Sequence, residues 1–244
     1  MRFRMVLLAL TVGALGACVD NDRSLTITHF VEATASMGAC TVPTDDMTTI
    51  SQGAWDVELA KLFGLGYVLS FNVENQLQVQ TGTTIDEQAY YINSYDVQLE
   101  PIGAVATGLP AGNRNFNVPS GSIRLAPGDI AGASVLALPP DLIGGLDSLT
   151  QDPLGTILVH LRPVATRAEE QVVGAYVQFP IEICKGCLTN ATTGNFPSCP
   201  LPAMSTVNPG NACNPSADLS VTCCNDAKLG LVCPATVSMT TTGP

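Results

Sequence analysis

The chain has 244 residues, of which 46% are hydrophobic and only 13% are charged. This composition excludes a disordered, highly charged protein, and the length is sufficient to bury a core. Ten Lys and Arg against 21 Asp and Glu give a net charge of −11, which argues against nucleic-acid binding because that function needs a basic surface.

The chain begins with a basic and then an apolar segment. Arg2 and Arg4 precede an apolar run from Met5 to Leu15. This run is too short to span a bilayer as a helix, but it has the length found in signal peptides. No second apolar run of about 18 residues follows, so we expect no transmembrane helix.

The apolar run ends in Leu15-Gly16-Ala17-Cys18. This motif resembles the lipobox of Gram-negative bacterial prolipoproteins, in which the cysteine carries acyl chains such as palmitate and the peptide is cut before it. The resemblance implies a signal peptide at residues 1–17, lipidation of Cys18 and a tether at residues 18–24. Two or more acyl chains give stable membrane anchoring. The alternative is a plain secreted protein that is cut after Gly16.

The same resemblance indicates a place in the cell envelope. Residue 19 is Val, not the Asp that favours inner-membrane retention in enteric lipoproteins, so we expect an outer-membrane anchor. Removing Arg2 and Arg4 with the signal peptide leaves eight basic residues against 21 acidic ones, for a net charge of −13. Such an acidic chain does not adsorb to an anionic bilayer through its own surface, so the lipid must hold it there.

Alternating apolar and polar residues predict β-strands in the middle of the chain. The longest alternation runs from Tyr67 to Val79, with Ser70 and Asn72 on the side away from the core. Asn75 interrupts the apolar side, which indicates a bulge or a polar contact. Seven further strands are predicted, at Leu25–Val31, Trp55–Leu59, Tyr91–Leu99, Phe116–Leu125, Ser134–Leu138, Ile157–Leu161 and Val173–Ile183. The polar stretch 165–170 predicts a long hairpin between the last two.

Helical signal is sparse. Leucines at helical spacing after Pro139-Pro140 predict one short helix over residues 141–149. Many short strands without regular helices favour an all-β fold. The strands at residues 25–183 resemble an immunoglobulin-like β-sandwich with extra strands. Trp55 is the only Trp, so the Cys…Trp…Cys pattern of antibody domains is absent and the resemblance is one of architecture.

The composition changes after Ile183. Residues 184–235 are rich in Cys and poor in charge and aromatic side chains, so this loop-like segment cannot build its own core and must be held by cross-links. Residues 236–244 are expected to form a flexible tail. With Cys18 acylated, eight cysteines can form four disulfides: Cys40, Cys184, Cys187, Cys199, Cys213, Cys223, Cys224 and Cys233. Seven lie in the C-terminal segment, so in a fully paired set Cys40 must bond to one of them. Adjacent Cys223 and Cys224 are expected to pair elsewhere.

Two more specific interpretations of these cysteines have less support than a role in structural disulfides. A redox role for the Cys184-Lys185-Gly186-Cys187 motif would require the pair at a helix start in a βαβ fold, whereas here it follows a strand. A zinc site at Cys187, Cys199 and Cys213 lacks a second CxxC or a His pair, and an oxidising compartment disfavours it. We therefore expect no metal and no cofactor.

No motif predicts catalysis. His29 and His160 are the only imidazoles, and neither a Gly-x-Ser-x-Gly nor a His-Glu-x-x-His sequence is present. His160 is expected at the surface and His29 within a strand. Roles in solubility and turns explain the carboxylate pairs better than a glycosidase site does. The pairs are Asp45-Asp46, Asp86-Glu87 and Glu169-Glu170.

These features predict a structural or interaction module, an adhesin or scaffold of the cell envelope, and not an enzyme. The expected partners are the membrane, through the lipid, together with envelope proteins or surface glycans bound at sheet edges and loops. One alternative is a carrier of a small apolar ligand such as a lipid, which requires an apolar cavity of several hundred Å³. Another is an envelope hydrolase, which requires a cleft where His160 or paired carboxylates converge.

Overall fold

A computed structural model describes residues 24–36, 38–44, 49–79, 82, 84–150, 153–189, 197–199, 208–228 and 230–233. The expected signal peptide at 1–17, the lipidation site Cys18, most of the tether, Asp45-Asp46 and the tail at 236–244 lie outside these residues. None of the helices in the described ranges is long and apolar enough to cross a bilayer.

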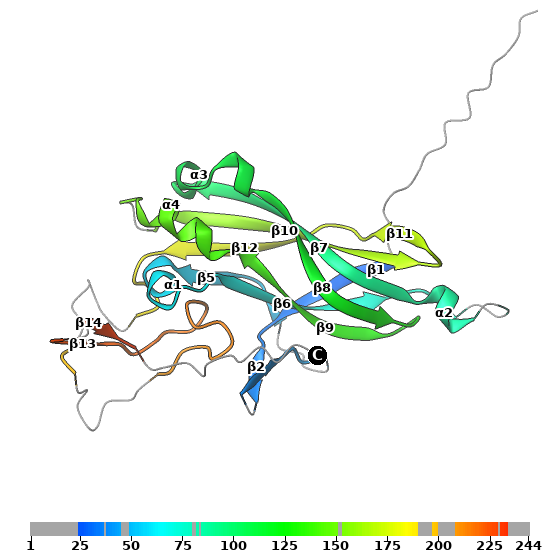
Figure 1. Ribbon diagram of the computed structural model, residues 1–244, viewed down its shortest axis with the longest axis horizontal. Helices are drawn as coiled ribbons and strands as arrows, with labels where there is room; N and C mark the ends of the chain where they lie inside the picture. The colour runs from blue at the N-terminus through cyan, green and yellow to red at the C-terminus, as the bar shows by residue number, and fades with distance from the viewer. Residues whose placement is uncertain are drawn as a thin grey trace, which may run out of the picture.

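The described chain forms an all-β sandwich (Figure 1). The smaller sheet has the order β4 (Thr49–Ile50), β1 (Leu25–Val31), β6 (Tyr67–Asn75) and β9 (Ile130–Leu138). The larger sheet has the order β5 (Gly53–Asp56), β12 (Val177–Cys184), β10 (Gly155–Arg167), β7 (Tyr90–Gly103) and β8 (Asn115–Leu125), with β11 (Glu170–Val173) paired to β10. Two small ladders are β2 (Thr34–Ser36) with β3 (Ala39–Thr41), and β13 (Cys224–Asp226) with β14 (Gly230–Val232).

The order of the strands confirms the immunoglobulin-like prediction. The chain crosses between the sheets from β6 to β7, forms a hairpin with β8, returns for β9 and crosses back for β10 and β12. β5 closes the edge of the larger sheet in parallel with β12. This alternation is the Greek-key arrangement of two packed antiparallel sheets.

Buried side chains from both sheets form one continuous hydrophobic core. At its centre the ring of Phe71 on β6 meets that of Tyr95 on β7 edge to face, with centroids 5.1 Å apart. Edge-to-face pairs add to the stabilisation that comes from burial alone. The Tyr95 hydroxyl has no hydrogen-bond partner in the described part of the chain, and burial raises the pKa of this group.

The predicted strand at 67–79 is too long, because Asn75 ends it. Its side chain is buried, and Nδ2 donates to the carbonyls of Gln88 and Leu125. Its Oδ1 accepts from the Leu77 amide, so the interruption of the apolar pattern marks a polar contact. Val79 lies beyond the strand and is 66% exposed.

The polar side of β6 is also less exposed than its pattern predicts. Ser70 and Asn72 face away from the core, yet both are buried. Val42 lies over this face beside Asn72, because a Cβ on Gly132, the residue paired with Asn72, would meet Val42 atoms within 3 Å. A segment from a distant part of the chain therefore covers this face, and alternation alone cannot reveal such a cover.

The prediction of a single short helix is wrong, since the described ranges contain four short α-helices: α1 (Val57–Phe63), α2 (Ile85–Gln88), α3 (Val105–Gly108) and α4 (Ile143–Asp147). Two 3₁₀ turns accompany them, η1 (Ala111–Asn113) and η2 (Pro140–Leu142). The helix predicted at 141–149 is found as η2 followed by α4. The strand predicted at 55–59 ends at Asp56, and α1 follows from Val57.

The hairpin predicted around residues 165–170 is confirmed. β10 continues to Arg167 and pairs in antiparallel register with both β11 and β12. Ala168 and Glu169 form the turn with positive φ values of 47° and 72°. Positive φ at both central positions is the geometry of a two-residue hairpin turn.

The Asp56 side chain connects the N-terminus of α1 to the C-terminal segment. The buried carboxylate accepts from the amides of Glu58 and Leu59 as the N-cap of α1, at 3.0 and 3.4 Å. It also accepts from the amides of Gly186 and Leu188, at 2.9 and 3.0 Å. Four backbone donors therefore depend on one side chain.

We predict that Asp56→Ala lowers the free energy of unfolding by more than about 3 kcal/mol, because buried donors lose their acceptor. Urea denaturation measures this effect. Asp86→Ala is the matched control, since Asp86 is exposed and its side chain bonds Arg124 on the surface. Equal stabilities of the two variants would contradict the role given to Asp56.

Candidate interaction surface

The eight cysteines form four disulfides: Cys40–Cys213, Cys184–Cys187, Cys199–Cys224 and Cys223–Cys233. The bond of Cys40 to the C-terminal segment is thus confirmed, as are the separate partners of Cys223 and Cys224. Cys187, Cys199 and Cys213 lie in three different disulfides, so the structure does not assemble them into a zinc site.

The CxxC motif is built into the fold at the end of β12. The Lys185 ammonium donates to the carbonyls of Asp147 and Leu149 at the end of α4. The Gly186 amide is held by Asp56, and Cys184 is buried. These contacts give the motif a structural role.

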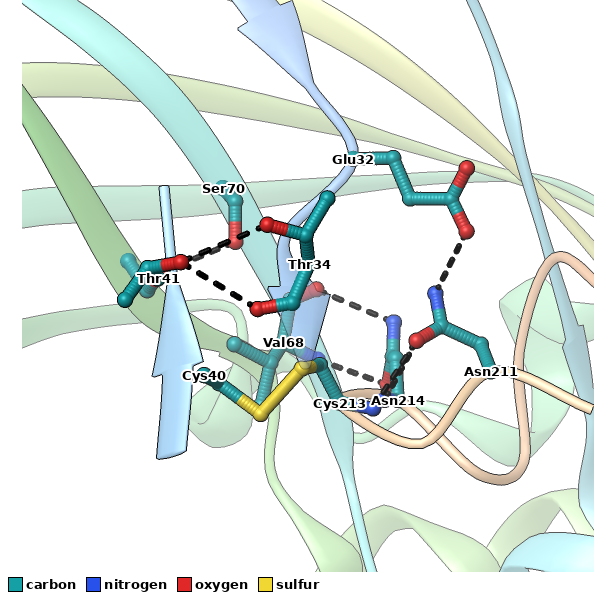
Figure 2. The surroundings of a disulfide bond; sticks show 10 residues. Glu32, Thr34, Cys40, Thr41, Val68, Ser70, Asn211, Cys213 and Asn214 are labelled. Carbon is teal, nitrogen blue, oxygen red and sulfur yellow. Dashed lines mark hydrogen bonds between the residues drawn. A yellow bond between two sulfur atoms is a disulfide. The ribbon is translucent and has the colours of Figure 1, made fainter. Parts of the chain in front are cut away.

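Figure 2 shows how Cys40–Cys213 brings the β2–β3 hairpin and the C-terminal segment together beside β6. The last β1–β6 pair is Phe30–Phe71, so Val68 has no β1 neighbour. The Asn214 side chain takes that place: its Oδ1 accepts from the Val68 amide at 3.3 Å and its Nδ2 donates to the Val68 carbonyl at 3.0 Å. One side-chain amide thus replaces a strand neighbour.

The same segment extends the edge of the larger sheet. The Asp56 amide donates to the Ser216 carbonyl, and the Asp218 amide donates to the Ala54 carbonyl, both at 3.0 Å. The Trp55 indole donates to the Ser216 hydroxyl at 3.2 Å. Residues 214–218 therefore close the edges of both sheets where β5 and β6 would otherwise be open.

Asp218 is the most constrained residue of this closure. Its carboxylate accepts from the Ala54 amide and from the Tyr67 hydroxyl, both at 3.0 Å, and its φ is 64°. Burial raises the pKa of this carboxyl group, and hydrogen bonds from Ala54 and Tyr67 oppose that shift. Gly53 leaves the room for it, because a Cβ there would lie 2.1 Å from the Tyr67 hydroxyl oxygen.

A cleft of about 250 Å³ opens beside this closure, outside the sandwich core. It is lined by Glu32, Ile50, Gln52, Gly53, Ala54, Glu182, Asp218 and Leu219. Three carboxylates in its wall make the cleft acidic, which is unsuited to an apolar ligand.

The two histidines lie on different sheets. His29 on β1 has its Nε2 2.9 Å from the Asn72 amide nitrogen. His160 on β10 has its Nε2 2.9 Å from Glu100 on β7, and its Nδ1 3.4 Å from the Gln178 amide. His160 is half-buried within a polar layer, so the prediction of a solvated residue is only partly right.

The predicted carboxylate pairs do not converge on a cleft. Asp86 bonds Arg124 at 2.6 Å, and Glu87 forms the capping box of α2 with Thr84. Glu169 lies in the hairpin turn, and Glu170 begins β11. Each of these four residues has a local structural role.

Polar side chains do gather on the outer face of the larger sheet. Register places Asp96 on β7 between Asn117 on β8 and Arg162 on β10. The next row has Gln98, His160 and Gln178 side by side on β7, β10 and β12. We call this surface the β7–β10 face; it comprises Ser94, Asp96, Gln98, Glu100, Asn117, His160, Arg162, Tyr176 and Gln178.

Hydrogen bonds and ring contacts order these side chains. Arg162 Nε donates to Asp96 at 3.0 Å, and Asn117 donates to the other Asp96 oxygen at 2.9 Å. The Arg162 guanidinium lies 4.5 Å from the ring centroid of Tyr176, in a cation–π contact. Tyr176 remains 43% exposed and projects from the loop between β11 and β12.

The sequence predicts only some of the residues of the β7–β10 face. The alternation predicts that Asp96, Gln98 and His160 point away from the core. The assembly of Asp96, Asn117 and Arg162 depends on strand register, which alternation does not determine. Tyr176 lies between strands and carries no periodic signal.

No protein-family model and no curated protein matches this chain. The candidate surface therefore stands on its own geometry and chemistry.

We predict that replacing Cys40 and Cys213 together by Ser lowers the free energy of unfolding by about 2–5 kcal/mol, because that disulfide closes the longest loop. The sequence separation is 173 residues, against 25 for Cys199–Cys224. The matched double variant of Cys199 and Cys224 should lose less, and urea denaturation compares the two. A larger loss in the control would contradict the importance given to the Cys40–Cys213 junction.

We predict that Asp218→Asn is at least as stable as the wild type at pH 7. The raised pKa means that the folded state holds the Asp218 proton more tightly than the unfolded state. This contribution to wild-type stability is fully present below the ordinary Asp pKa and is lost as the pH rises through the folded-state pKa. The advantage of Asp218→Asn should therefore shrink as the pH falls towards 4. Thermal unfolding across pH measures it, and a growing advantage at low pH would contradict the assignment.

Proposed function

We propose that the protein is an outer-membrane-anchored lipoprotein that acts as an interaction module of the cell envelope, in adhesion or as a scaffold. The lipobox-like motif ending at Cys18 supports the anchor. The β7–β10 face supports the interaction role, and it is the single observation on which that role depends. It is an ordered array of amides, charges and one exposed tyrosine.

The chemistry of this face suits a polar partner. Asp96 and Arg162 neutralise each other at 2.9 Å, and the amides of Gln98, Asn117 and Gln178 offer neutral donors and acceptors. Tyrosine and arginine are enriched at the centres of protein interfaces, where they supply large contact areas. An envelope protein or a surface glycan fits these groups.

The two other functions have less support. A carrier of an apolar ligand needs an apolar cavity, whereas the core here is a continuous cluster of buried side chains from both sheets, and the described cleft is acidic. A hydrolase needs converging acid, base or nucleophile. His160 meets Glu100 and Gln178 on the outer face of the larger sheet, and it does not line the described cleft.

The anchor is tested by the intact mass of the protein extracted from membranes in detergent, with and without alkylation. We expect a chain that begins at Cys18 with acyl chains and has no alkylated thiol. A mass that corresponds to cleavage after Gly16, without lipid, would identify a plain secreted protein. A co-purifying lipid in native mass spectra would favour the carrier.

The interaction face is tested by a photo-crosslinking amino acid at Gln178, in cells that carry the acylated protein. We expect a crosslinked product that disappears in Arg162→Ala, because the guanidinium orders Asp96 and Tyr176. Lys61→Ala is the control, since Lys61 pairs with Asp147 on α4 away from the face. Products that persist in Arg162→Ala would refute binding at the β7–β10 face.

A further inference from the structure

β9 is an edge strand that lacks the usual protection of an edge. In the part of the chain that the structure describes, its one strand partner is β6, so the backbone groups on its other side meet no strand. Its nine residues include no charged residue and no proline. The ladder with β6 is regular from Ile130 to Leu136, and these two side chains are 44% and 37% exposed. An edge of this kind pairs readily with another strand.

The other edges of the two sheets are interrupted or covered. On β8, Pro119 removes a backbone donor and residues 120–122 form a bulge against β7. The edge at β5 is closed by residues 214–218. β1 has a register shift within its ladder and pairs at its end with β4. Among the described strands, β9 therefore presents the longest uninterrupted edge.

The apolar core also reaches the surface along this side of the sandwich. β8 and β9 are joined by the turn at residues 126–129 and border the same side of the fold (Figure 1). Four of their side chains pack against the core but are only partly buried: Phe116, Val118, Ile123 and Ala131. No strand lies beyond β8 and β9 in the described ranges, so a partner on this side would bury further apolar surface.

A second copy of β9 complements the first in antiparallel register about Ala133. Ile130 then lies opposite Leu136 of the second copy, and Leu136 lies opposite Ile130 of the second copy, with Cβ atoms about 5 Å apart. Gly132 lies opposite Ser134, which is small enough to avoid a clash. The two exposed apolar side chains of each copy thus cover those of the other.

No like charges meet across this pairing of strands. β9 has no charged side chain, and the neighbouring strand β6 has only Glu74, beside Ile130. Six residue steps from Ile130 to Leu136 place the two Glu74 carboxylates about 20 Å apart along the strands. The centres of protein interfaces are depleted in charged residues, and this edge meets that condition. Because the edge also complements itself about Ala133, a second copy is favoured over an unrelated strand.

We propose that two copies of the chain pair through β9 to form a symmetric dimer. The two four-stranded sheets join into one continuous sheet across the dimer axis. Each copy uses the same strand in the same way, so the contact closes at two copies and does not extend into a fibre. The β7–β10 face lies on the larger sheet, so the dimer presents it twice. This inference does not depend on the lipid anchor or on the partner of that face.

A charge exchange across β9 tests the dimer by sedimentation velocity of the purified full-length protein over a concentration series. Leu136→Lys and Ile130→Glu each place a charge opposite an apolar side chain, so we expect each to raise the dimer Kd at least about tenfold. With both substitutions in one chain, each new ammonium lies opposite a new carboxylate, and we expect a Kd within about threefold of the wild type. Ile102→Lys is the matched control with unchanged Kd, since Ile102 is 52% exposed on β7 of the other sheet.

A monomeric wild type, single variants that dimerise like the wild type, or a double variant that does not recover would each overturn the β9 dimer. Circular dichroism verifies the fold of each variant. If a single variant fails to fold, a photo-crosslinking amino acid at Leu136 replaces it, and we expect a dimeric product joined to the peptide that contains Ile130. A dimeric product joined elsewhere, or a product with another protein alone, would also overturn the proposal.

Discussion

The structure depends on the way residues 214–218 close the edges of β5 and of the start of β6, beyond the end of β1. At this corner, in the part of the chain that the structure describes, neither β5 nor the start of β6 has a strand neighbour on its outer edge. Unpaired backbone groups at a sheet edge invite pairing with other chains, and buried ones cost free energy. Asn214 and Asp218 satisfy these groups with side chains, and Ser216 does so with its carbonyl, while its hydroxyl accepts from the Trp55 indole.

The composition of the C-terminal segment follows from this task. Its small and polar residues fit against two sheet edges, but they bury little apolar surface. A second, small hydrophobic cluster helps, in which Leu188, Val221 and Cys223 pack with Leu59 of α1. Cross-links supply the rest, since disulfides lower the conformational entropy of the unfolded chain without needing a large core. The segment is therefore part of the sandwich wall and not an independent unit.

Local signals in the sequence were sufficient for the main antiparallel strands and for the bond of Cys40 to the C-terminal segment, but they left the other disulfide pairings open. Leu25–Val31 and the antiparallel strands of the larger sheet follow from alternation, and Cys40 follows from counting. The start of α1 was missed because Trp55, Val57 and Leu59 alternate like a strand, although Asp56 is a good N-cap. Its second role, as acceptor for Gly186 and Leu188, requires contacts across 130 residues that no local pattern encodes.

The β7–β10 face likewise could be predicted only in part from local sequence patterns. β7 has 14 residues, roughly 45 Å of strand, and runs from Tyr90 beside Ser24 to Gly103 at the opposite end. Along this strand Val97 and Leu99 pack into the core, and Asp96, Gln98 and Glu100 alternate with them on the outer face. The residues that pack the core therefore also hold the polar side chains of the β7–β10 face in place. The contacts of Asp96 with Asn117 and Arg162 add the register of β8 and β10, so this face depends on the whole sheet and not on any one strand.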